Sequence, residues 1–155
     1  MPQIRTESFG EIEFAESAVF RFPLGLPAFE DEREFVFVER PGTAPLLFMQ
    51  SVTSHTLCFI LLPILAVDPE YQLVLEEDQV AILGLSSTRP RIGEDVLCAA
   101  IVRAARRPDE VPTANLLAPL VVNFRNGLGV QVIQPGTRYS HCHPLLKTEE
   151  LAPCS

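Results

Sequence analysis

The sequence predicts an all-β fold, in the form of a small antiparallel β-barrel-like single domain with one short helix. Short apolar or alternating runs recur along the 155 residues and are separated by clusters of Gly, Pro, Asn and Asp. The chain also holds 14 prolines, which strand starts, sheet edges and connections tolerate but helix interiors do not. With 47% hydrophobic residues, one domain of this size can bury roughly 68–70% of the surface of its unfolded chain.

The predicted strands follow one another along the whole chain. Each is rich in β-branched, aromatic or other apolar residues and is bounded by turn-forming residues. They cover residues 3–6, 11–14, 18–22, 35–39, 46–50, 57–62, 96–104, 118–124 and 129–134. Strands this short and numerous are typical of a closed or nearly closed antiparallel barrel. We expect residues 1–146 to form one domain and residues 147–155 to form a short, flexible C-terminal tail.

Two turns between these strands have recognisable sequences. Gly10 separates the first two runs, which predicts a hairpin. The Asn126-Gly127 pair supplies the positive φ that tight hairpins require. Residues 120–124 and 130–133 should therefore pair as neighbouring strands.

One short helix is predicted over residues 76–84. Three acidic residues at its start favour the positive end of the helix dipole, and Gly84 is a typical stop. Further along, Thr113 and Asn115 are turn or cap residues, and Pro119 lacks a backbone donor. The segment 113–123 therefore reads as a turn that leads into a strand, without the activating base that a nucleophile would need.

Charge limits the class of partner. The formal net charge is -8, so most of the surface repels a nucleic-acid backbone and favours a basic protein. The start, "MPQIRTESFG", has no apolar segment of the kind a secretory signal needs. The longest apolar run, residues 57–67, contains a proline and is well short of the ~20 residues of a membrane-spanning helix. We expect a soluble, cytoplasmic protein.

Cysteine and histidine offer little chemistry. Cys58 and Cys98 lie in apolar runs and are expected to pack as small hydrophobes. The "SHCHP" segment around Cys142, with distant Cys154, lacks the ligand spacing of structural zinc sites, so neither a metal nor a cofactor is expected. An enzyme would have to use His55 or His143 as its base, and no convincing nucleophile accompanies either. A hydrolase therefore ranks last among the hypotheses.

The remaining charged segments predict surfaces. Arg103, Arg106 and Arg107 form the one local positive patch, and without interleaved aromatics it is more typical of a strand end than of an RNA groove. Acidic residues gather at 30–32, at 68 and 70, and at 76–78, as a solvated face or as a recognition surface for a cationic partner. The segment 20–39 is either an anchored crossover loop or one that presents apolar side chains.

Five segments in register resemble the FliW family of flagellar assembly factors, from about Ile4 to Leu145. They are "FPLGLPAFEDEREFVFVE", "LLFMQSV", "VDPEYQLVLEEDQVAILGL", "TANLLAPLVVN" and "YSHCHPL". The sequence departs from the family at Ala28, where a glycine is usual, and at Cys142, where the closing motif usually lacks a cysteine. The resemblance implies a non-enzymatic, β-barrel-like regulator that binds newly made flagellin and the translational repressor CsrA, a small RNA-binding dimer. The two partners would act as a homeostatic switch.

This resemblance assigns roles to the candidate surfaces. Carboxylates would face the basic, RNA-binding surface of CsrA, and amphipathic helical ends of flagellin would contact apolar side chains. Gln50, Asn115 and Asn123 fall in the family segments and are expected to make structural hydrogen bonds. A small ligand-binding or scaffolding barrel remains the alternative function. The predicted CsrA-facing residues are Glu30, Asp31, Glu32, Asp68, Glu70, Glu76, Glu77 and Asp78, and the predicted flagellin-facing residues are Leu24, Leu26 and Phe29.

Overall fold

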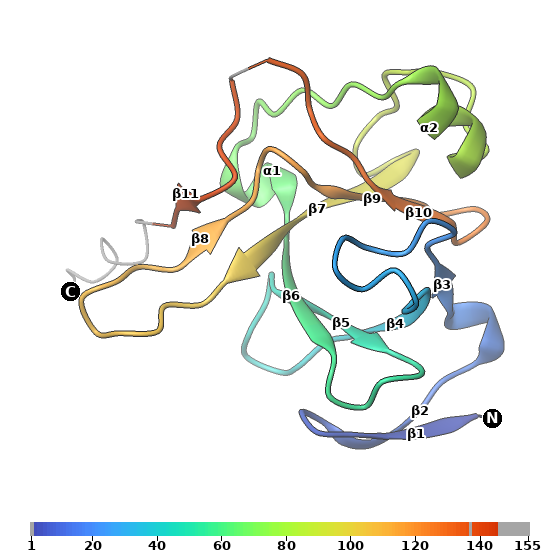
Figure 1. The fold of residues 1–155 in the computed structure, drawn as a ribbon, viewed down its shortest axis with the longest axis vertical. Helices are drawn as coiled ribbons and strands as arrows, with labels where there is room; N and C mark the ends of the chain where they lie inside the picture. The colour runs from blue at the N-terminus through green and yellow to red at the C-terminus, as the bar shows by residue number, and fades with distance from the viewer. Residues whose placement is uncertain (1, 137, 146–155) are drawn as a thin grey trace.

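A computed structural model describes residues 2–136 and 138–145 and confirms a mostly antiparallel β fold (Figure 1). The predicted tail, residues 147–155, and Cys154 lie outside the described residues. The strands are β1 (Gln3–Thr6), β2 (Gly10–Glu13), β3 (Phe20–Arg21), β4 (Glu34–Val38), β5 (Leu47–Ser51), β6 (Cys58–Pro63), β7 (Val96–Arg103), β8 (Thr113–Ala114), β9 (Leu120–Asn123), β10 (Gly129–Gln131) and β11 (His143–Pro144). The helices are α1 (Ile64–Val67), α2 (Glu77–Leu83) and the single 3-10 turn η1 (Glu16–Ala18).

The main sheet has nine strands and is not closed. Its path runs β10-β9-β7-β6-β5-β4-β3, with β8 paired to β7 and β11 paired to β8, while β1 and β2 form a separate hairpin. Between the two ends of the path, the described residues form one parallel bridge, Arg21 with Leu128. The Arg21 N–H donates to the Gly127 carbonyl at 2.8 Å. The fold is thus barrel-like only in a loose sense, because a single bridge replaces a closing ladder.

The Asn126-Gly127 hairpin forms as predicted. β9 and β10 pair antiparallel, with Val121 opposite Val130, and Gly127 has a φ of 71°. This hairpin forms one end of the sheet, next to β3 (Figure 1).

Two apolar cores lie on opposite faces of β7 and β9. Val96 and Val121 belong to the core under α1, α2 and the segment 71–75. Leu120 and Val122 point the other way, into the core that Phe35 shares with the other strands of the curved sheet. Because both faces of these strands are buried, their sequences read as continuous apolar runs instead of alternating patterns.

Helix α2 confirms the predicted helix and its stop. Gly84 ends it in the left-handed conformation, with a φ of 71°. At the other end, the Gln79 side chain accepts a hydrogen bond from the Glu76 N–H at 2.8 Å. Asn123 on β9 donates to the Leu83 carbonyl at 2.8 Å and so ties the helix end to the sheet. Over the described residues, the helices are all too short to cross a membrane.

Three short elements differ from the sequence prediction. Thr113 lies in strand β8 and not in a turn, because its backbone pairs with both β7 and β11. β11 and α1 were not predicted either, since two-residue strands and a four-residue helix carry no periodicity. Asn115 does make a turn, where its side chain accepts a hydrogen bond from the Ala118 N–H at 3.0 Å.

Candidate functional site

The 22–33 loop, which joins β3 to β4, is a firmly built surface feature. Its two ends are joined where the Phe22 N–H donates to the Arg33 carbonyl at 2.7 Å. At its tip, residues 26–29 form a tight turn in which the Phe29 N–H donates to the Leu26 carbonyl at 2.7 Å. Pro27 at the second position and a φ of 70° at Ala28 match a type II turn. Glycine is the favoured residue at that third position, because it adopts a positive φ without strain.

This loop presents two of its three predicted apolar residues. Leu24 is 58% exposed and Phe29 is 39% exposed, and the Phe29 ring rests edge-on against Phe59 at 5.7 Å between centroids. Leu26 does not lie on the surface: it is 3% exposed and belongs to the core with Phe35. The turn points Leu26 inward while its neighbours face out, so the exposed apolar surface consists of Leu24 and Phe29.

The acidic residues that follow differ in their surroundings. Asp31 is exposed, and the exposed Glu30 carboxylate accepts a hydrogen bond from the Ala28 N–H at 3.2 Å. Glu32 is half-buried and accepts hydrogen bonds from the hydroxyls of Ser51 and Thr53. These hydrogen bonds, with Thr53 contributing more, lower the pKa of Glu32 below the usual value of 4.5. Glu32 therefore fastens the loop to the end of β5, while Glu30 and Asp31 keep their charge at the surface.

The other two acidic clusters lie at the ends of the helices. Asp68 follows α1 and is half-buried, and its carboxylate accepts a hydrogen bond from the Glu70 N–H at 3.0 Å. Glu76, Glu77 and Asp78 open α2 and are all exposed. Across residues 2–136 and 138–145, none of the eight predicted carboxylates forms an ion pair with a Lys or Arg of the chain. Their negative charge is therefore available to another molecule.

The buried amides that the sequence singled out are structural. Gln50 is buried on β5, and its side-chain nitrogen donates to the carbonyls of Ser51 and Ser54, both at 3.1 Å. Asn123 holds the end of α2 and also accepts a hydrogen bond from the Arg125 N–H at 2.9 Å. These contacts shape the turns that follow β5 and β9 and leave neither amide facing solvent.

The histidines lack the partners that catalysis would require. His55 is exposed between β5 and β6, and in the part of the chain that the structure describes no histidine side chain shares a hydrogen bond with a hydroxyl, thiol or carboxylate. Among those same residues, no group of three His, Cys, Asp or Glu side chains could hold a metal ion. Cys98 is buried, as predicted, and burial raises the pKa of its thiol to about 12.

Comparison with known proteins assigns the family. The family model described as FliW protein matches residues 3–145. The chain belongs to the FliW family. A flagellar assembly factor FliW of Desulfitobacterium hafniense (strain DSM 10664 / DCB-2) is 35% identical over 143 residues, which are 92% of this chain and 90% of that protein. The FliW of Bacillus subtilis (strain 168) is 32% identical over 142 residues, 92% of this chain and 95% of its own. A crystal structure of the flagellar assembly factor FliW superposes with a TM-score of 0.81 at 33% identity, covering 93% of this chain and 96% of that one.

Proposed function

We propose that this FliW-family chain is a non-enzymatic flagellar assembly factor that works in the cytoplasm, binds flagellin, and antagonises the translational repressor CsrA. Flagellin and CsrA bind the chain in alternation. When flagellin is exported, the freed chain holds CsrA away from the flagellin message. When flagellin accumulates, it occupies the chain and CsrA is released to repress that message.

One observation carries the CsrA part of this proposal. Eight carboxylates on three segments have no cationic partner within the described residues, in a chain of net charge -8. A protein surface that binds RNA phosphates is cationic, so such carboxylates attract it and speed its association. Carboxylates placed beside that surface also weaken its hold on RNA, which is what antagonism requires. The cluster at residues 76–78 is the most favourable of the three, because all its side chains are exposed.

The flagellin part depends on the exposed apolar residues of the 22–33 loop. Leu24 and Phe29 lie at the surface, and Phe29 is oriented by its contact with Phe59. A fixed aromatic ring beside an aliphatic side chain suits the apolar face of an amphipathic helix. Backbone hydrogen bonds already hold the turn that carries Phe29, so this turn would lose little conformational entropy on binding.

The CsrA surface is tested by the rate of association. Replacing Glu76, Glu77 and Asp78 with lysine should slow complex formation with purified CsrA, measured by stopped flow, and most strongly at low salt, where screening is weak. A control variant with lysine at Glu7, Glu16 and Glu39 changes the net charge by the same amount at other exposed positions. Equal rates for the two variants would remove the 76–78 cluster from the interface.

The flagellin surface is tested by affinity. Alanine at Leu24 and Phe29 should abolish flagellin capture, measured by calorimetry on a variant whose thermal unfolding shows that it still folds. The buried Leu26 is left in place, because its truncation would open a cavity and cost about 2–5 kcal/mol. Alanine at Phe124 and Ile133 is the matched control, since both are exposed and lie elsewhere. Full affinity in the first variant would reject the loop as the contact.

The packed interior weighs against the ligand-binding alternative. A ligand-binding barrel needs an apolar cavity large enough to hold a molecule. Here Phe35, Met49 and Leu61 are fully buried and fill the inner face of the curved sheet. The packed interior therefore favours a protein that binds its partners on its outer surface.

A further inference from the structure

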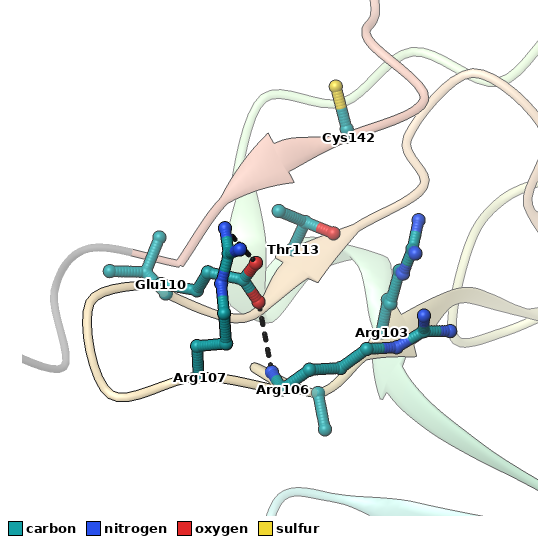
Figure 2. Close-up of a pocket in the computed structure, with 8 residues that line it drawn as sticks. Arg103, Arg106, Arg107, Glu110, Thr113 and Cys142 are labelled. Carbon is teal, nitrogen blue, oxygen red and sulfur yellow. Dashed lines mark hydrogen bonds and ion pairs between the residues drawn. The ribbon is translucent and has the colours of Figure 1, made fainter.

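An open hollow next to the end of β7 is lined by three of the eleven arginines of this acidic chain. It has a volume of about 510 Å³ and is lined by side chains from β7, from the 104–112 loop, from β8, and by Cys142 just before β11. Figure 2 shows Arg103, Arg106 and Arg107 around it, with Glu110 and Thr113. All three arginines are exposed.

Among the described residues, carboxylates pair with one of these arginines and not with the other two. The Arg107 guanidinium pairs with Glu110 at 3.0 Å and with Asp109 at 3.6 Å. The other carboxylate oxygen of Glu110 accepts a hydrogen bond from the Arg106 backbone N–H at 3.0 Å, which fixes the shape of the loop. Within the described residues, the guanidiniums of Arg103 and Arg106 form neither an ion pair nor a hydrogen bond, and Figure 2 shows both extending away from the Arg107–Glu110 pair.

We propose that this basic hollow is a docking surface for an acidic peptide segment of a partner protein. Guanidinium groups present several N–H donors in a planar fork that matches a carboxylate, so Arg103 and Arg106 can each hold one carboxylate. The small side chain of Ala104 also lines the hollow. The charge of this surface is opposite to that of the acidic clusters. A binding role here goes beyond the function proposed above, because the hollow would hold an acidic segment that those clusters repel.

Other occupants fit the hollow less well. A nucleic acid would meet no aromatic side chain on which to stack a base, and the net charge of -8 repels its phosphates outside the hollow. A small anion would be poorly enclosed, because the hollow is open to solvent. A peptide with spaced carboxylates can reach both free guanidiniums and place its backbone over Val111 and Thr113.

Binding of a short fluorescein-labelled Glu-rich peptide to the full chain, measured by anisotropy, tests the proposal. The Glu-rich peptide should bind at low salt, whereas its Gln-substituted counterpart should not. The double variant Arg103→Gln, Arg106→Gln should weaken binding at least about tenfold, the equivalent of one lost charge-assisted contact. The control variant Arg89→Gln, Arg125→Gln removes two exposed arginines elsewhere and should bind as the unchanged chain does.

A third variant distinguishes specific recognition by the arginines from general electrostatic attraction. Glu110→Gln removes the nearer of the two carboxylates that pair with Arg107 and leaves only Asp109, while it keeps an oxygen that can accept the Arg106 N–H. It should therefore tighten peptide binding. Equal losses in the two double-arginine variants would overturn the proposal, as would tighter binding of an oligouridine than of the Glu-rich peptide. Self-association of the chain that disappears in the Arg103→Gln, Arg106→Gln variant, without peptide binding, would assign the hollow to a second copy and would also overturn it.

Discussion

Replacing Ala28 with glycine should stabilise the protein. Ala28 has a φ of 70°, where the Cβ of an L-residue crowds the following carbonyl oxygen. The turn requires this conformation, because Pro27 precedes it and the Phe29 N–H closes it on the Leu26 carbonyl. Glycine adopts the same φ without that crowding.

The expected gain is the difference between two effects. Relief of the left-handed strain is worth about 1–2 kcal/mol. Glycine also gives the unfolded chain more freedom, which costs about 0.4–1 kcal/mol. The net increase in the free energy of unfolding is therefore about 0.5–1 kcal/mol, and the melting temperature of a chain of this size should rise by about 1–4 °C.

Urea unfolding followed by circular dichroism measures this change, provided that the slope with denaturant stays constant. Ala81→Gly is the matched control, because Ala81 is exposed within α2, where glycine should instead destabilise by about 1 kcal/mol. A midpoint for Ala28→Gly at or below that of the unchanged chain would refute the argument that Ala28 is strained.

Three further predictions concern stability. Gly25→Ala should lower the free energy of unfolding by more than about 1 kcal/mol, because the new Cβ would lie 2.4 Å from the Glu30 carbonyl oxygen. Gly42→Ala is the control in thermal unfolding: Gly42 has a similar φ but open space around it, so this variant measures the backbone cost alone. Asn123→Ala should cost about 0.5–1.5 kcal/mol in urea unfolding, because it removes one hydrogen bond to the Leu83 carbonyl, which keeps the Asn126 side chain as a second donor. The lowered pKa of Glu32 stabilises the fold above the usual value of 4.5, and this stabilisation is lost as the pH falls through the folded-state pKa. The drop in melting temperature on acidification should therefore be smaller in Glu32→Gln, and an unchanged drop would show that Glu32 does not contribute.

Local chemistry made much of the fold predictable. The Asn126-Gly127 turn and the Gly84 stop both follow from a required positive φ, which few residues other than glycine accept. The continuous apolar run of β9 is explained by burial on both faces, since Val121 and Val122 enter different cores. Wherever a short sequence constrains the backbone directly, the structure agrees with it.

The parts that were missed depend on the three-dimensional arrangement of the chain. Thr113 becomes a strand residue only because β7 and β11 flank it, and the residues around Thr113 do not indicate either neighbouring strand. Leu26 reads like Leu24 in the sequence, yet the turn buries one and exposes the other. In the part of the chain that the structure describes, Glu110 pairs with Arg107 and not with Arg103 or Arg106, a choice that the sequence does not reveal. Which segments pair, and which side chains are buried, therefore depends on the tertiary structure.

The seam between β3 and β10 bears on how the root of the 22–33 loop is anchored. There the sheet is sealed by side-chain packing: Phe22 lies so close to Gly129 that a Cβ at position 129 would come within 2.7 Å of its ring. The backbone hydrogen bond from the Arg21 N–H to the Gly127 carbonyl also crosses the gap. Any side chain at position 129 would therefore push Phe22, the first residue of the loop, away from the hairpin and open the sheet at this seam, whereas the ladders from β4 to β9 do not depend on that contact.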